Sequence, residues 1–325
     1  MKVHNPFHSG ERLIQKLAGE TALAERNGAI GDTIMPGALP FLQQQNMLII
    51  GSASPQGEVW ASILFGPKGF VESADGKVVR IHLDPDTRDG DDPLWENVAL
   101  GKSLAGLAID LGTRRRLRIN GRVIASEPNL LTVAVEEAYG NCPKYIHRRL
   151  LKLRADSRPG GGRVEHGSAI TGVAREIVES ADTFFVASAN PHGGADVSHR
   201  GGHAGFVSVV NERTLSVPDY RGNSMFNTLG NLAINPAAGI LIVDFVGRRT
   251  LQMTGDAETH WPEVANYQEG ADTGRSWTFR VRRWVLSPLH APVEWEFVDF
   301  SPYNPRLEMK MPRNSASPGA SNQEE

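Results

Sequence analysis

The strongest constraint on the fold is an internal repeat. The stretch SASPQGEVWASILFGPKGF (52–70) aligns with SANPHGGADVSHRGGHAGF (188–206) at an offset of 136 residues, with eight of 19 positions identical. A second pair of blocks, 95–121 and 229–255, aligns at an offset of 134. Because both pairs occur in the same order, the pattern favours a duplicated structural unit over a chance resemblance between two β-rich stretches.

Both repeats have the pattern of short β-strands. The runs NMLIIGSAS (46–54) and DTFFVASAN (182–190) are apolar and are followed by Pro and Gly, which is typical of a strand that enters a hairpin. Five or six such strands in each repeat predict two small antiparallel barrels. Helices are predicted at 10–26, 129–140 and 170–182. The expected fold class is therefore mostly β with a few helices.

Composition limits the compartment and the class of partner. Lys and Arg total 34 and Asp and Glu total 37, a net charge of −3 that argues against a general nucleic-acid binder. The single cysteine, Cys142, excludes an intrachain disulfide and fits a reducing compartment. The first 13 residues lack the apolar core of a signal peptide, and no run approaches the ~20 apolar residues of a membrane span. We expect a cytoplasmic protein without a membrane or nucleic-acid partner.

The segment DVSHRGGHAGF (196–206) is the first candidate for a functional site. His199 and His203 are four residues apart, which suits a metal only on a helix, and the two glycines between them disfavour a helix. No metal site is therefore predicted. Arg200 beside glycines is typical of a loop that binds an anion, because glycines let backbone N–H groups approach the ligand closely.

The segments that follow differ in charge between the repeats. The second repeat has Arg221, Asn223 and Ser224, whereas the first has five aspartates, at positions 84, 86, 89, 91 and 92. Phosphate needs cationic, hydroxyl or amide donors, and a carboxylate cluster repels it. The sequence therefore predicts anion binding by the second repeat only. Solvated loops that drifted apart in charge are the alternative.

Several segments together resemble the pyridoxamine 5′-phosphate oxidase-like family of FMN-binding split barrels, and specifically its long tandem members. These segments are ADVSHRGGHAGFV (195–207), LSVPDYRGNSMFNTLGNLAINPAAGILIVDF (215–245), YGNCPKYIHRR (139–149) and FSPYNP (300–305), and the similarity covers roughly residues 5–310. The resemblance implies FMN bound noncovalently where two barrels meet, normally in a homodimer. The two repeats would form that dimer within one chain, as a pseudo-dimer.

The resemblance also implies which residues contact the cofactor. The strand SHRG would contact the flavin and its phosphate, PDYRGNS would close over the ribityl chain and phosphate, and RRRLRING of the first repeat would reach across. The cofactor-binding residues expected on this basis are Ser198, His199, Arg200, Gly201, Asp219, Tyr220, Asn223, Ser224, Arg116 and Arg118. A second cationic pair for the phosphate and the late Trp and Arg motif of true pyridoxamine phosphate oxidases are not visible. Pyridoxamine phosphate is therefore not the expected substrate.

The segment NCPKYIHRR (141–149) has no counterpart in the second repeat. One interpretation is a lid over the flavin that holds an anionic substrate, with Lys144, Tyr145, His147 and Arg148 as candidates. The other is a buried structural cysteine followed by a basic, solvated helix. The sequence leaves both open.

These observations predict a domain organisation and three classes of function. We expect a first split barrel with a helical insert and a degenerate flavin site at 1–154, a linker at 155–168, a second split barrel with the FMN phosphate loop at 169–310, and a disordered tail at 311–325. The first class is an FMN-dependent oxidoreductase acting on a small substrate, anionic if the lid interpretation holds, or on a nicotinamide nucleotide. The others are a flavin-binding or electron-transfer module without turnover, and a split barrel that holds a deazaflavin coenzyme or haem. The chain would be a monomeric pseudo-dimer or a homodimer.

Overall fold

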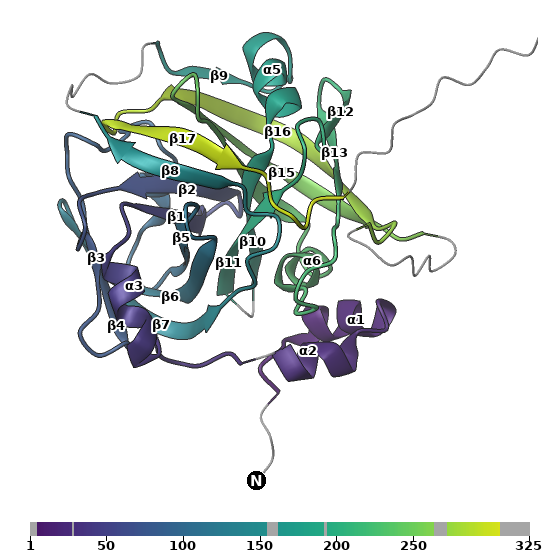
Figure 1. Ribbon diagram of the computed structural model, residues 1–325, viewed down its shortest axis with the longest axis horizontal. Coiled ribbons are helices and arrows are strands. Elements are labelled where there is room, and N and C mark those ends of the chain that lie inside the picture. The colour runs from purple at the N-terminus through teal and green to yellow at the C-terminus, as the bar shows by residue number, and fades with distance from the viewer. Residues whose placement is uncertain (1–4, 28, 155–161, 192–193, 263–271, 306–325) are drawn as a thin grey trace, which may run out of the picture.

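The computed structural model describes residues 5–27, 29–154, 162–191, 194–262 and 272–305. Its two main sheets are antiparallel and share one strand order (Figure 1). The first sheet runs β2-β1-β5-β6-β7-β4-β3 and the second β11-β10-β14-β15-β16-β13-β12, so each strand of the first has a counterpart in the second. The predicted fold class, mostly β with a few helices, is confirmed.

The strands of the two sheets fall in the two repeats. The first sheet comprises β1 (Met47–Ala53), β2 (Val59–Phe65), β3 (Val71–Glu72), β4 (Val78–His82), β5 (Ser103–Asp110), β6 (Arg115–Glu127) and β7 (Leu130–Gly140). The second comprises β10 (Thr183–Asn190), β11 (Gly194–Gly201), β12 (Ser208–Asn211), β13 (Thr214–Pro218), β14 (Ala237–Asp244), β15 (Arg249–His260) and β16 (Ser276–Pro288). The helical segments are α1 (Ser9–Leu17), α2 (Thr21–Asn27), the 3-10 turn η1 (Pro36–Ala38), α3 (Leu39–Gln43), α4 (Leu94–Asn97), α5 (Gly172–Ser180) and α6 (Asn227–Leu232). Among the described residues, no helix has the length and hydropathy needed to cross a membrane.

Residues that recur in the sequence recur in the same structural roles. Asn97 Nδ2 donates to Ser52 Oγ at 3.0 Å, and Asn231 Nδ2 donates to Ser188 Oγ at the same distance. The repeated pair Arg114 and Arg248 both adopt left-handed backbone conformations, with φ of 56° and 54°. The repeat in the sequence is therefore a repeat of local geometry.

The two sheets pack against each other through β1, β2 and β5 on one side and β10, β11 and β14 on the other. The core between them draws on both repeats, with Ile49 and Leu107 from the first and Phe185 and Leu241 from the second. Burying each such side chain stabilises the fold by roughly 1.5–3 kcal/mol. This shared core fixes the two repeats relative to each other.

The N-terminal helices α1 and α2 lie against the second repeat, beside α6 (Figure 1). A Cβ on Gly10 would meet the carbonyl oxygen of Gly230 at 2.1 Å, so glycine is needed for this close approach. Gln15 Nε2 donates to the Met225 carbonyl oxygen at 3.1 Å, and Asn227 Nδ2 donates to Glu11 Oε1 at 2.5 Å. The predicted helices at 10–26 and 170–182 are confirmed as α1, α2 and α5, but the contact of α1 with the second repeat was not foreseen.

The prediction of a helical insert at 129–140 is wrong. This stretch is strand β7, which pairs with β4 on one side and β6 on the other. Its β-branched residues Thr132, Val133 and Val135 suit a paired strand, and the two pairings outweigh the helical preference of the Glu and Ala residues that follow.

The ends of the two repeats meet in a separate two-stranded sheet. Strand β8 (Arg148–Leu153) pairs with β17 (Val293–Asp299). Within the predicted linker, β9 (Glu165–Gly167) pairs with β16, while 155–161 lies outside the described residues. The predicted tail at 311–325 also lies outside the described residues.

Candidate functional site

One pocket opens between the two repeats, beside the edge strand β11. It is open to solvent and has a cavity volume of about 90 Å³. The structure brings to this pocket every cofactor-binding residue predicted from the sequence, namely Ser198, His199, Arg200, Gly201, Asp219, Tyr220, Asn223, Ser224, Arg116 and Arg118. Of the substrate-side candidates, Lys144 and Tyr145 line it as well.

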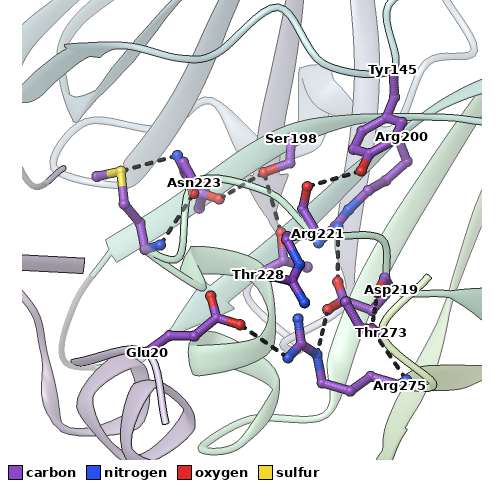
Figure 2. A network of polar contacts seen from close by, with 12 residues as sticks. Glu20, Tyr145, Ser198, Arg200, Asp219, Arg221, Asn223, Thr228, Thr273 and Arg275 are labelled. Carbon is purple, nitrogen blue, oxygen red and sulfur yellow. Dashed lines mark hydrogen bonds and ion pairs between the residues drawn. The ribbon is translucent and has the colours of Figure 1, made fainter. Parts of the chain in front are cut away.

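On the second-repeat side of the pocket, two arginines share one carboxylate (Figure 2). Asp219 Oδ1 lies 3.0 Å from Arg200 Nη1, and Asp219 Oδ2 lies 3.0 Å from Arg275 Nε. Glu20 reaches the same network from the N-terminal helices, 3.4 Å from Arg275 Nη1, and accepts from Ser224 Oγ at 2.6 Å. Sequence reasoning missed Arg275 and Glu20, which are 255 residues apart and belong to no motif.

On the first-repeat side, Arg118 extends from β6 into the second repeat. Its Nε lies 3.0 Å from Asp196 Oδ1, and its Nη1 donates to Tyr139 Oη at 2.9 Å and Asn227 Oδ1 at 2.8 Å. Its Nη2 also donates to Ser198 Oγ. Burial, the largest single cause, lowers the pKa of Arg118, but the charge of Asp196 together with the contributions of Tyr139 and Glu11 raises it overall. Arg118 is thus a fixed, charged link between the repeats.

His199 is the least satisfied polar side chain of the pocket wall. It is 5 % exposed, and neither ring nitrogen has a hydrogen-bond partner among the described residues. Burial and the nearby charge of Arg116 lower its pKa well below the ordinary range, so the imidazole is neutral. A neutral imidazole can donate one hydrogen bond and accept another, and a buried group without either is costly.

Residues 141–145 connect the two sides of the pocket. Asn223 Nδ2 donates to Asn141 Oδ1 at 3.1 Å, and Tyr145 Oη donates to the Arg221 carbonyl oxygen at 2.9 Å. A Cβ at Gly201 would meet the Tyr145 carbonyl oxygen at 2.1 Å, so this position needs glycine. The segment is not helical, which corrects the interpretation as a basic, solvated helix.

Two of the substrate-side candidates do not line the pocket. His147 is buried, with Nε2 2.9 Å from the Gly202 carbonyl oxygen, and Nδ1 accepts from Ser301 N at 3.1 Å. Arg148 Nη2 lies 2.7 Å from Asp299 Oδ2. Neither residue lines the pocket, and the prediction that they hold a substrate stays untested. The substrate-side candidates that do line it are Lys144 and Tyr145.

The first repeat has a matching but smaller cavity, with a volume of about 30 Å³. Gln252 occupies the place of Arg118 and donates to Ser62 Oγ at 3.1 Å. Ser62 in turn donates to Asp92 Oδ1 at 2.6 Å, and burial raises the pKa of Asp92 to about 6. Leu64 stands where the second repeat has Arg200. This cavity lacks the cations of its counterpart at both positions.

Comparison with known proteins identifies one family. Residues 170–284 match the family model described as pyridoxamine 5′-phosphate oxidase. A comparison with curated proteins finds no match.

Matching solved structures include a FAD-binding protein from Mesorhizobium loti, with 11% identity over 38% of this chain and 96% of that one and a TM-score of 0.26. They also include HutZ, the heme storage protein from Vibrio cholerae, with 11% identity over 35% of this chain and 91% of that one and a TM-score of 0.25. An F420 reductase matches with 13% identity over 33% of this chain and 98% of that one, at a TM-score of 0.23.

The family match covers α5 and nearly the whole second sheet, including β11 and the 216–227 segment of the pocket. The second repeat, over residues 170–284, is thus similar to the pyridoxamine 5′-phosphate oxidase family.

Proposed function

We propose that the protein binds one FMN molecule, noncovalently, between its two repeats and works as a flavin-dependent oxidoreductase. The observation that carries this proposal is the pocket in which cations from both repeats surround His199, a buried residue whose ring nitrogens lack partners. The matching first-repeat cavity has Gln252 and Leu64 in place of Arg118 and Arg200.

The second-repeat wall fits a phosphate group. Arg200 and Arg275 supply forked cationic donors, and Asn223 and Ser224 supply amide and hydroxyl groups, all within one pocket. Asp219 pairs with both guanidinium groups and Glu20 pairs with that of Arg275, so these two carboxylates offset the charge of the arginines. Arg275 provides the second cation that the sequence did not reveal.

The remaining polar groups fit the ring system. His199, Ser198 and Arg118 would meet its polar atoms, and His199 would gain the partners that it lacks. When bound, FMN supplies a ring that accepts a hydride and passes it on. The chain's own part is positioning, since Asp196 fixes Arg118 and residues 141–145 link the two walls and limit the access of water.

The first test is the identity of the ligand. Purified protein is denatured, and the released small molecule is identified by mass spectrometry, with the absorption spectrum of the intact protein as a second record. FMN supports the proposal. A deazaflavin coenzyme, FAD or haem would replace FMN as the cofactor, and failure to bind added FMN at micromolar concentration would contradict it.

The second test separates an enzyme from a flavin store. Flavin-loaded protein is mixed anaerobically with NADH or NADPH, and bleaching of the flavin is followed in a stopped-flow instrument. Bleaching that saturates with reductant, followed by reoxidation on adding an acceptor, supports turnover. A flavin that neither nucleotide reduces favours a non-catalytic binding or electron-transfer module.

A further inference from the structure

The two walls of the pocket differ in how their cations are balanced. On the second-repeat wall, Asp219 pairs with both Arg200 and Arg275. On the first-repeat wall, Arg116 and Lys144 have no carboxylate within ion-pair distance among the residues that the structure describes. The first-repeat wall therefore carries positive charge that the protein does not neutralise.

Arg116 is held in place without being neutralised. Its Nε donates to the Cys142 carbonyl oxygen at 2.9 Å, and its Nη2 lies 3.8 Å from Cys142 Sγ. Burial, together with the charges of Arg118 and Arg200, lowers its pKa to about 10, so the group is charged at neutral pH. A partly buried charge without a counter-ion is unfavourable. Among the described residues no hydrogen bond involves Nη1, so this group can contact an anion in the pocket.

Two aromatic rings border the same region. Tyr145 and Tyr220 both line the pocket, with ring centroids 5.4 Å apart and planes inclined by 39°. Tyr145 is fixed at both ends, because its Oη donates to the Arg221 carbonyl oxygen and its backbone N donates to Ser301 Oγ at 3.1 Å. Burial raises the pKa of Tyr145, so the phenol is neutral. Neutral aromatic faces held in place favour a planar ligand.

We propose that Arg116 and Lys144, with Tyr145 beside them, form an anion subsite for a small planar substrate that carries a carboxylate or phosphate group. The inference rests on the proposed function, in which the opposite wall binds the flavin phosphate. It moves Arg116 from the expected cofactor contacts to the substrate. Arg118, neutralised by Asp196, stays with the cofactor.

The test is calorimetric titration of FMN-saturated protein with benzoate, phenyl phosphate and neutral benzamide. Both anions are expected to bind and benzamide to bind more weakly by about tenfold or more, since it lacks the charge-assisted contact. The tighter of the two anions then identifies a carboxylate or a phosphate as the preferred group. Equal binding of benzoate and benzamide, or no binding of either anion, would overturn the subsite.

The matched variants are Arg116→Gln and Arg115→Gln. Arg115 precedes Arg116 on β6 but is exposed, lies over the Phe41 ring and lines a different groove. Arg116→Gln is expected to lower the affinity for benzoate by about 10- to 150-fold, and Arg115→Gln to lower it by less than about twofold. Equal effects of the two variants would contradict the proposal, as would loss of FMN affinity in Arg116→Gln with benzoate unaffected. Arg116→Lys, which keeps the charge, should recover part of the benzoate affinity and guards against a folding defect.

The same titration without FMN separates the two proposals. One outcome is that FMN does not bind, while the affinity for benzoate falls in Arg116→Gln and not in Arg200→Gln. The subsite then stands and the flavin proposal fails. If FMN binds and Arg116→Gln leaves the affinity for benzoate unchanged, the flavin proposal stands and the subsite fails.

Discussion

In the second repeat, Ser198 accepts a hydrogen bond from Arg118 of the first repeat. In the first repeat, the matching Ser62 accepts a hydrogen bond from Gln252 of the second repeat. The strands that carry these residues correspond in order and pairing, yet one cavity has a volume of about 90 Å³ and the other of about 30 Å³. The carboxylate partner changes too, because the position of Asp196 is taken by the fully buried Trp60. One backbone arrangement thus gives a pocket lined by Arg118 and Arg200 or a smaller cavity with Gln252 and Leu64 at those positions.

The largest expected effect is a loss of stability in Arg118→Gln. This change gives the second-repeat pocket the glutamine that the first-repeat cavity has as Gln252. Asp196 would remain 3 % exposed without its cation, which should lower the free energy of unfolding by about 3–5 kcal/mol. Guanidinium unfolding curves measure the change. The double variant Arg118→Gln/Asp196→Asn removes the unpaired charge and should recover most of the loss. A single variant within about 1 kcal/mol of the parent would show that the link between the repeats matters little.

The next comparison is between Arg200 and its counterpart Leu64. Arg200→Ala should raise the dissociation constant for FMN by about 10- to 100-fold, because a charge-assisted contact contributes roughly 1.5–3 kcal/mol. Riboflavin, which has no phosphate, should lose much less affinity. Leu64→Met, which keeps the volume of the buried side chain, is the matched change and should leave both affinities unaltered. Flavin fluorescence titrations give the four dissociation constants, and equal losses for both flavins would remove Arg200 from the phosphate site.

A third comparison uses one buried carboxyl group beside each cavity. Burial, with the nearby charges of Asp196 and Glu137, raises the pKa of Glu11 to about 8, and burial raises the pKa of Asp92 to about 6. Both values lie above those of the unfolded chain, so the folded state holds a proton that the unfolded state releases. Stability attributable to Glu11 should therefore fall as pH rises from about 4.5 to 8, and that attributable to Asp92 from about 3.8 to 6.

The variants Glu11→Gln and Asp92→Asn test these two windows. Relative to the parent, Glu11→Gln should gain at least about 1.4 kcal/mol, the equivalent of one pKa unit, between pH 5 and pH 9. Asp92→Asn should gain its stability below pH 7 and show no further change above it. Urea unfolding at several pH values measures both, and parallel pH profiles for Glu11→Gln and the parent would contradict the account of Glu11.

The smallest expected effect is the loss of one Asn–Ser hydrogen bond that occurs in both repeats. Ser52→Ala and Ser188→Ala each remove the acceptor of a matching 3.0 Å hydrogen bond from Asn97 or Asn231. Each change should cost about 1 kcal/mol, and the two costs should agree to within about 0.5 kcal/mol. Thermal unfolding compares them. A clear inequality would show that the recurring residues do not have equal roles.

The sequence predicts the repeated parts of the molecule well and the contacts between distant segments poorly. The aligned blocks predict two similar sheets, because recurring residues such as Asn97 and Asn231 make matching hydrogen bonds in the two repeats. The 129–140 stretch predicts a helix because Glu and Ala residues obscure its alternation, and only pairing with β4 and β6 makes it a strand.

The candidate site divides in the same way. Motif residues on β11 and in the 216–227 segment could be placed from the sequence, because they are close in the chain. Arg275 could not, since the pairing of β13 with β16 brings it to Asp219. Glu20 could not, since the folding of α1 and α2 onto the second repeat brings it to Ser224 and Arg275. His147 looked like a ligand-binding residue, but its ring nitrogens face backbone groups of Gly202 and Ser301, which no local pattern reveals.

The central claim is that the two repeats share one backbone arrangement, but that only the pocket beside β11 of the second repeat binds a cofactor. The most direct measurement is the ratio of flavin to protein after the chain is saturated with FMN, freed of unbound flavin and denatured to release what it holds. The account predicts one flavin per chain, with the ratio falling sharply in Arg200→Ala at limiting FMN and unchanged in Leu64→Met. Two flavins per chain, or one flavin that persists in Arg200→Ala under the same conditions, would contradict it.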